Sequence, residues 1–320
     1  MTDQIVDTLV SEDVLHRFML EKAGVRGVLV RLGASWKEIA SRAEYSTPLR
    51  ATLGQAVAAS ALLTGNIKFE GSLSIEFKSQ GSLRLLFAEC TDKGRLRGLA
   101  RVDENEPGAL ADAVNLARAP EALLVITIGQ ADRGRYQGIV DLAGDGADAS
   151  THEGPSSQLA AALEGYFEKS EQLPARILLA ANGDHAVGLM LQPVPGEGGH
   201  GAAEQDDDAW DRVGHLTATL SAAEMLATRP EELLYRLYHE ETVRMYEPRA
   251  LEFGCTCSQE RVEGMLRALG RTEVEAALED RAGEIEVVCE FCATRYTFDR
   301  VDAERLLTQA ETPPSPSTLQ

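Results

Sequence analysis

Residues 255–292 read CTCSQERVEGMLRALGRTEVEAALEDRAGEIEVVCEFC, and they hold four of the five cysteines of the chain. Cys255 and Cys257 form a C-x-C pair at the start, and Cys289 and Cys292 form a C-x-x-C pair at the end. Four thiolates match Zn²⁺, which takes sulfur ligands in closed tetrahedral sites. We therefore predict that these four cysteines bind one zinc ion per chain.

Three alternatives to a zinc site fit the four cysteines less well. Independent core cysteines would not pair twice at ligand spacing, although free cysteine is often a small buried residue. Permanent disulfides are disfavoured because cytosolic thiols are normally kept reduced. An iron–sulfur cluster also takes four thiolates, but the spacing differs from that of ferredoxins. A zinc ion that only stabilises a small domain remains open as the simpler role for the metal.

The residues between and beside the cysteine pairs predict helices and strands. Ser258 can cap a helix that Gly270 ends, and 272–275 resembles a capping box that opens a second helix through Leu278. Alternating apolar residues predict a strand before Cys289 and another after Cys292. The first cysteine pair should therefore precede the helices, and the second should occupy a turn between two strands.

Toward the N-terminus, strand and helix patterns are mixed. Apolar runs and alternation predict strands at 27–32, 71–77, 83–87, 124–128, 136–140, 176–181 and 186–191. The last six form three hairpins because turn residues separate them in pairs. Apolar spacing predicts helices at 49–64 and 159–169. This pattern indicates an α+β fold, with an N-terminal domain of hairpin-connected antiparallel sheets and packed helices.

A connector lies between the two zones. Residues 193–208 are rich in Pro, Gly and Asp, and two helices are predicted after them, at 213–226 and from a cap at Thr228 through 238. Residues 196–250 contain 12 acidic and 5 basic residues, which suits a solvated linker. The apolar stripes of both helices must cover a neighbouring surface, such as the first domain.

The composition limits the class of protein. The chain has 320 residues and a net charge of -20, which argues against general binding to nucleic acid or to anionic membranes. The longest apolar runs are far shorter than the roughly 20 residues that span a bilayer. No secretory signal precedes Glu12, so we expect a cytoplasmic protein.

Enzymatic functions find no support in the sequence. The N-terminal part contains no G-x-S-x-G, H-E-x-x-H, Walker or dinucleotide-binding motif, and we predict no catalytic residues. A thiol oxidoreductase would need its C-x-x-C at a helix N-terminus beside a βαβ unit. A zinc-ribbon regulatory or nucleic-acid-binding protein with purely structural zinc is the alternative function, but the acidic residues around the cysteines disfavour it.

The cysteine arrangement and its surroundings resemble the redox-regulated holdase chaperones of bacteria, the 33 kDa heat-shock protein family. The resemblance covers nearly the whole chain, and residues 196–208 and the tail after Leu307 look like additions. Cys90 lies outside the family motif. The matching segments are 68–71, 81–84, 97–98, 136–140, 166–174, 239–244, 247–248, 253–258 and 289–292.

The resemblance implies a mechanism. The reduced, zinc-bound protein would be an inactive monomer, and oxidants would form Cys255–Cys257 and Cys289–Cys292 disulfides and release zinc. The C-terminal domain and the linker would then unfold. The active form would dimerise and hold unfolding client proteins without ATP, until ATP-dependent chaperones take them over.

We expect four regions along the chain. These are an N-terminal α+β chaperone domain (1–195), an acidic helical linker (196–250), a C-terminal zinc-binding redox-switch domain (251–310) and a disordered tail (311–320).

Overall fold

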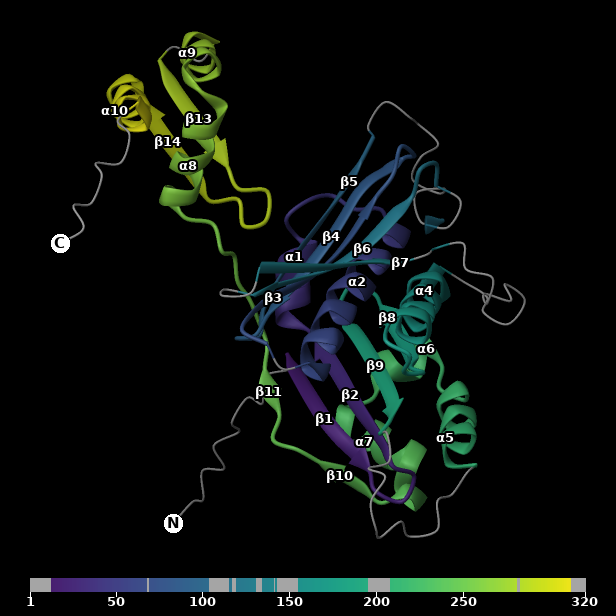
Figure 1. The fold of residues 1–320 in the computed structure, drawn as a ribbon. Coiled ribbons are helices and arrows are strands. Elements are labelled where there is room, and N and C mark those ends of the chain that lie inside the picture. Colours follow the sequence, from purple (N-terminus) through teal and green to yellow (C-terminus); the bar gives the residue numbers. More distant parts are fainter. Residues whose placement is uncertain are drawn as a thin grey trace, which may run out of the picture. The chain divides into compact units, whose positions relative to one another are not determined.

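A computed structural model describes residues 13–67, 69–103, 115–116, 119–130, 134–140, 142, 155–194, 208–280 and 283–311. The chain divides into two compact units, Met1–Gly254 and Cys255–Gln320 (Figure 1). Most of the predicted loop, at 195–207, and most of the predicted tail, at 312–320, lie outside the described residues.

The first unit contains two six-stranded sheets among its described residues. Sheet A has the order β10-β1-β2-β9-β8 with β11 beside β1, and sheet B has the order β12-β5-β4-β3-β6-β7. The strands of sheet A are β1 (Val14–Leu20), β2 (Val25–Leu32), β8 (Arg176–Ala181), β9 (Ala186–Pro193), β10 (Val243–Met245) and β11 (Arg249–Ala250). Those of sheet B are β3 (Gly71–Lys78), β4 (Leu83–Thr91), β5 (Arg95–Val102), β6 (Leu123–Gln130), β7 (Gly134–Val140) and β12 (Glu252–Phe253).

The three predicted hairpins of this unit are confirmed. Strands β3 and β4, β6 and β7, and β8 and β9 pair antiparallel as neighbours in the chain. Other pairings join distant segments, such as β2 with β9 and β3 with β6. The fold is therefore α+β with antiparallel sheets, and β12 adds one parallel pairing with β5.

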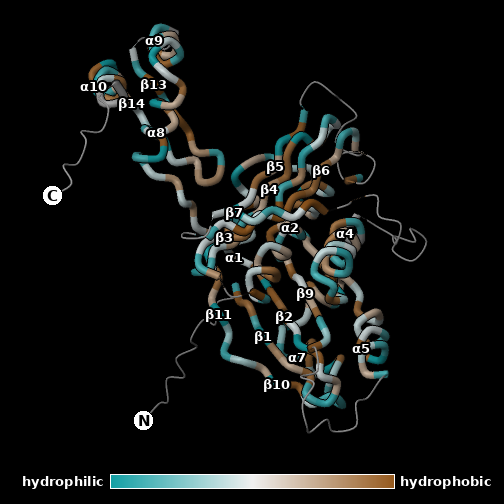
Figure 2. The backbone as a smooth tube through the Cα atoms, in the orientation of Figure 1, coloured by the Kyte–Doolittle hydropathy of each residue, from teal (hydrophilic) through white to brown (hydrophobic). Residues whose placement is uncertain are grey.

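Helix α2 (Thr47–Asn66) packs against strands of both sheets (Figure 1). The spacing of its apolar residues predicts that one face of the helix is buried. The helix is instead buried on several sides, because it lies in the main core. Small residues such as Ala58, Ala59 and Ser60 are fully buried on this helix. Figure 2 shows the hydrophobic segments along α2 and the adjoining strands β2 and β9. Helix α1 (Ala34–Ala40) and helix α4 (Pro155–Ser170) complete this part.

The helices of the predicted linker fold back onto sheet A. Apolar residues of α5 (Ala209–Ala218), α6 (Ala222–Ala227) and α7 (Pro230–Tyr238) share a buried cluster with residues of β1, β2, β8 and β9. The 3-10 helix η2 (His239–Glu241) follows. The expected covering of a neighbouring surface is therefore confirmed for these helices.

Two predicted details of this region are wrong. Instead of a single helix at 213–226, α5 ends at Ala218 and Ser221 caps a new helix by accepting a hydrogen bond from Glu224 N–H. Thr228 does not cap the next helix, because Arg229 is its N-cap and no side chain caps it. Pro230 at the first turn sets the helix start instead, because its fixed φ suits that position.

The second unit is small. It contains helices α8 (Gln259–Leu269), α9 (Arg271–Asp280) and α10 (Arg300–Glu311), and the antiparallel hairpin of β13 (Glu284–Val288) and β14 (Arg295–Asp299). Its described core has eight buried residues: Leu266, Val274, Leu278, Ile285, Phe298, Ala303, Leu306 and Leu307. The capping box predicted at 272–275 is wrong, because α9 already begins at Arg271. Helix α10 is not among the predicted elements.

No helix in the described parts of either unit combines the length and apolar character needed to cross a bilayer.

Candidate metal centre

The C-x-C pair lies in a short loop before α8. Ser258 caps this helix as predicted, and its hydroxyl accepts a hydrogen bond from Arg261 N–H at 3.3 Å. The Arg261 guanidinium reaches back and donates to the carbonyl oxygen of Thr256 at 2.7 Å and to its hydroxyl at 2.9 Å. The residue between the two cysteines is therefore fixed to the first turn of the helix.

The C-x-x-C pair lies in the turn between β13 and β14, as predicted. Cys289 N–H donates to the carbonyl oxygen of Thr294 at 2.9 Å, and Ala293 N–H donates to that of Cys289 at 2.7 Å. Ala293 adopts a φ of 57°, in the left-handed backbone region that residues other than glycine rarely occupy. These bonds form a tight turn that holds both thiols on one side of the hairpin.

The four sulfur atoms converge. All lie within 4.8 Å of one another, with 3.6 Å between Cys255 and Cys289 and 3.3 Å between Cys257 and Cys292. A tetrahedral site with bonds of about 2.3 Å to zinc has sulfur–sulfur edges of about 3.8 Å. The donor set and its spacing therefore fit one tetrahedral zinc ion. Both short distances join the two cysteine pairs, so they do not identify which cysteines would form disulfides.

The local environments of these thiols differ. Burial raises the pKa of Cys255 to about 12, and burial also raises the pKa of Cys289. Burial acts in the same direction on Cys292, but hydrogen bonds from Thr294 and neighbouring groups outweigh it and lower its pKa to about 6. A bound cation would favour the thiolate at all four positions, because metal ligation displaces the thiol proton.

Tyr296 is a part of the site that was not among the predicted site residues. Its ring packs against the core of the second unit, and its hydroxyl donates a hydrogen bond to Cys257 Sγ at 3.1 Å. This hydrogen bond raises the pKa of Tyr296 to about 12. The only signal in the sequence is its spacing, since Tyr296 shares a strand face with the core residue Phe298.

The remaining cysteine is remote from the group. Cys90 lies on β4 in the buried core of the first unit, and burial raises its pKa to about 11. His239, the nearest preceding histidine, lies on η2 and does not join the described cluster of four sulfurs. Neither residue adds a ligand to the site.

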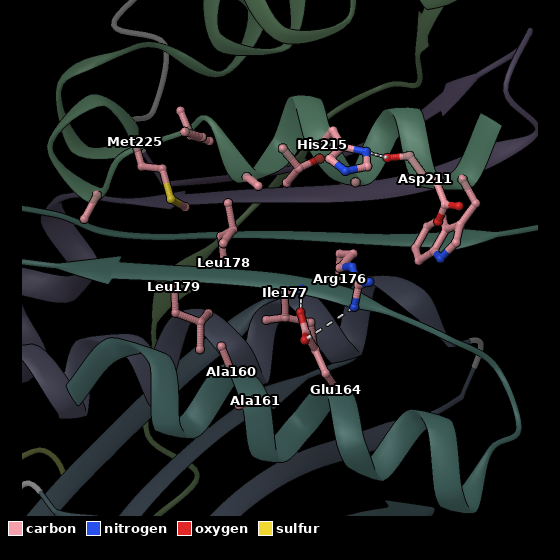
Figure 3. A pocket seen from close by; sticks show the side chains of 16 residues that line it. Ala160, Ala161, Glu164, Arg176, Ile177, Leu178, Leu179, Asp211, His215 and Met225 are labelled. Carbon is pink, nitrogen blue, oxygen red and sulfur yellow. Dashed lines mark hydrogen bonds and ion pairs between the residues drawn. The ribbon is translucent and has the colours of Figure 1, made fainter. Parts of the chain in front are cut away.

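A separate cavity lies where the linker helices pack against the rest of the first unit. This cavity of about 650 Å³ lies between α4, β8 and the α5–α6 segment, and Ile177, Leu179 and Met225 contribute apolar lining (Figure 3). Arg176 lies 3.9 Å from Glu164 and places its guanidinium 5.9 Å from the centre of the Trp210 ring. The linker helices therefore rest on apolar surface with polar contacts at its margin.

Known proteins are similar to this chain along nearly its whole length. The sequence model of the family described as Hsp33 protein matches residues 13–299. The 33 kDa chaperonin of Nitrosococcus oceani is 43% identical over 309 residues, covering 96% of this chain and 99% of that relative. The 33 kDa chaperonin of Shewanella sediminis is 39% identical over 304 residues, covering 95% and 98%.

A solved structure has the same fold. The crystal structure of the 33 kDa chaperonin (heat shock protein 33 homolog) from Thermotoga maritima aligns with a TM-score of 0.73 and 20% identity. The alignment covers 93% of this chain and 98% of that one. The fold is thus shared at low sequence identity.

Proposed function

This chain belongs to the Hsp33 chaperone family, and we propose that it is a redox-regulated, ATP-independent holdase switched by its four clustered cysteines. The observation that carries the proposal is the convergence of the four sulfur atoms on a unit whose described core has only eight buried residues. A unit this small depends on additional stabilisation, which bound metal often supplies.

In the reduced state, Cys255, Cys257, Cys289 and Cys292 would hold one Zn²⁺ per chain. The bound ion would supply a cross-link between the loop before α8 and the β13–β14 turn. The chain's own contribution is to present the four thiolates together, through the Arg261–Thr256 bonds on one side and the Cys289–Thr294 bond on the other.

Oxidation removes these ligands. Hypochlorous acid takes two electrons from a pair of thiolates, the O–Cl bond breaks, and one proton is consumed as an S–S bond forms and chloride and water leave. We propose the pairs Cys255–Cys257 and Cys289–Cys292, from the family resemblance and from their closeness in the chain. Two such steps convert the four thiolates to two disulfides, which no longer form a zinc site.

Loss of the metal would unfold the second unit and loosen the linker helices. The apolar residues of α5, α6 and α7 that now contact sheet A would then be available to unfolding client proteins. The acidic surface would keep the resulting complexes in solution. We propose the corresponding regions as the chaperone domain (1–195), the linker (196–250), the redox switch (251–310) and the tail (311–320).

The remaining parts of the proposal follow from the family. We propose that the oxidised protein dimerises, that ATP-dependent chaperones receive its clients after reduction, and that it acts in the cytoplasm. We propose no enzymatic activity, no nucleic-acid partner and no membrane partner. The acidic composition supports the last two points.

The test combines zinc release with chaperone activity. Reduced, zinc-loaded protein is treated with hypochlorite, and released zinc, free thiols and the aggregation of a heat-unfolding client are measured. We expect one zinc per chain to be released, four thiols to be lost and aggregation to be suppressed only after oxidation. Retained zinc, or zinc release without suppression of aggregation, would overturn the proposal.

A pair of variants identifies the responsible thiols. Replacing Cys255 and Cys257 by serine should abolish tight zinc binding. The Cys90→Ser variant should bind zinc and respond to oxidant as the parent protein does, because Cys90 lies in the other unit.

A further inference from the structure

The four sulfur atoms receive hydrogen bonds from different sources. Cys257 N–H donates to Cys255 Sγ at 3.4 Å. Cys292 Sγ is hydrogen-bonded to the Thr294 hydroxyl at 3.1 Å. Each of these partners lies in the same loop or turn as the sulfur that it contacts.

Cys257 has a hydrogen-bond partner from another element. The side-chain hydroxyl of Tyr296 donates to its sulfur at 3.1 Å. Tyr296 lies on β14, beyond the C-x-x-C turn, whereas Cys257 lies in the loop before α8. The hydrogen bond therefore connects the two halves of the cysteine cluster.

The position of the Tyr296 hydroxyl is fixed by its surroundings. Tyr296 pairs with Val287 across the hairpin, and its ring packs against the core that includes Phe298. A side chain held in this way can keep its hydroxyl on a metal ligand without a further loss of side-chain freedom. Such outer partners orient metal ligands and tune their basicity.

We propose that Tyr296 is a positioning residue that sets the reactivity of the Cys257 sulfur toward oxidants. This inference rests on the proposed redox function. A hydrogen bond to a thiolate withdraws electron density from its lone pairs, which lowers its nucleophilicity, and it also fixes the direction of the sulfur. Tyr296 therefore both supports metal ligation by Cys257 and slows its oxidation.

The principal test replaces Tyr296 by phenylalanine, which keeps the ring and removes the hydroxyl. In the Tyr296→Phe variant, zinc affinity should fall roughly 10-fold, as for other outer partners of metal ligands. Hypochlorite-driven zinc release should become roughly 3- to 10-fold faster. In the parent, part of the charged hydrogen bond is lost on the way to the transition state, and the variant has no such bond to lose. The Tyr246→Phe variant, in the first unit, is the matched control and should behave as the parent.

A spectroscopic readout separates tuning from a purely structural role. With Co²⁺ in place of zinc, the sulfur-to-cobalt charge-transfer band should move to lower energy in Tyr296→Phe, because the thiolate lone pairs rise in energy. The ligand-field bands should stay tetrahedral, which reports that the site is intact. Unchanged charge-transfer energy together with an unchanged rate of zinc release would overturn the inference.

A second substitution keeps the shape of the side chain. Incorporation of 3-fluorotyrosine at position 296 makes the phenol a stronger donor, so relative to the parent the charge-transfer band should move to higher energy and zinc release should become slower. A band at lower energy or faster zinc release than in the parent would contradict the inference, whether or not Tyr296→Phe folds. If the parent protein itself retains zinc under oxidant, the proposed function fails instead.

Discussion

The two units of this chain achieve their structure by different means. The first surrounds a buried helix with two sheets and has two large apolar clusters, one around α2 and one beneath the linker helices. The second has eight buried core residues in its described part and four converging thiols. Apolar burial stabilises the first, and we propose that metal ligation stabilises the second.

This contrast makes the second unit suitable as a switch. Removing a few ligands from a small metal-dependent unit can unfold all of it, whereas a large apolar core loses only a fraction of its stability through any single change. Under the proposed function, an oxidant would need to react only at the cysteines to produce a large structural change.

The largest effect is expected from loss of the ligands. Replacing Cys255 and Cys257 by serine should unfold residues 255–311, because zinc binding contributes about 10–16 kcal/mol in small zinc-dependent units. Limited proteolysis with mass identification should show new cleavage within residues 255–311 and in the loosened linker helices α5, α6 and α7, whereas α2 and the strands of the first unit stay resistant. Equal protease resistance of this region in the variant and in the parent would show that its core suffices without metal.

A matched pair of core substitutions sharpens the contrast. Phe77 in the first unit and Phe298 in the second are both fully buried, and replacement by alanine should cost about 3–5 kcal/mol in each case. Only Phe298→Ala should lower the chelator concentration at which the second unit unfolds. If Phe77→Ala lowered this chelator concentration by the same amount, the proposed difference between the two units would be contradicted.

A smaller, stabilising effect is expected at Ala293. Its positive φ is strained for alanine, so Ala293→Gly should stabilise the second unit by about 0.5–1 kcal/mol after allowance for the greater freedom of glycine when unfolded. Thermal unfolding of the zinc-loaded protein measures this change. An unchanged or lower midpoint for the second unit would contradict the expected relief of strain.

The smallest effect concerns pH and the first unit. Burial lowers the pKa of His16 below its ordinary value of 6.5, and the nearby Glu231 of α7 partly opposes this. As the pH falls, the unfolded state therefore binds the His16 proton before the folded state does. The stability that comes from keeping His16 neutral is fully present above pH 6.5 and is lost as the pH falls through the lowered pKa of the folded state.

Hydrogen exchange of α7 at pH 7.5 and pH 5.5 tests the role of His16. Protection of α7 should decrease at the lower pH in the parent and change less in His16→Gln. The same pH dependence in both proteins would assign the effect to other groups.

Much of this architecture was predictable from local sequence patterns. The hairpins β3–β4, β6–β7 and β8–β9 carry alternation and turn residues in the chain itself. The convergence of the four cysteines was also predictable, because ligand spacing and the predicted elements between the pairs required it. The presence of zinc remains a prediction.

The remaining features depend on contacts between distant residues. The pairing of β12 with β5 involves two residues on one side, too few for a strand pattern. The all-round burial of α2 follows from two sheets packing on it, which its own spacing does not reveal. The Tyr296–Cys257 hydrogen bond likewise joins residues that are 39 positions apart.

Hydrogen exchange before and after hypochlorite treatment tests the central claim most directly. We predict that, once zinc is released, peptides from α8, α9 and α10 exchange as an unfolded chain while those from α2, β2 and β4 stay protected. Continued protection of α8, α9 and α10 after complete zinc release and thiol oxidation would contradict the proposed switch.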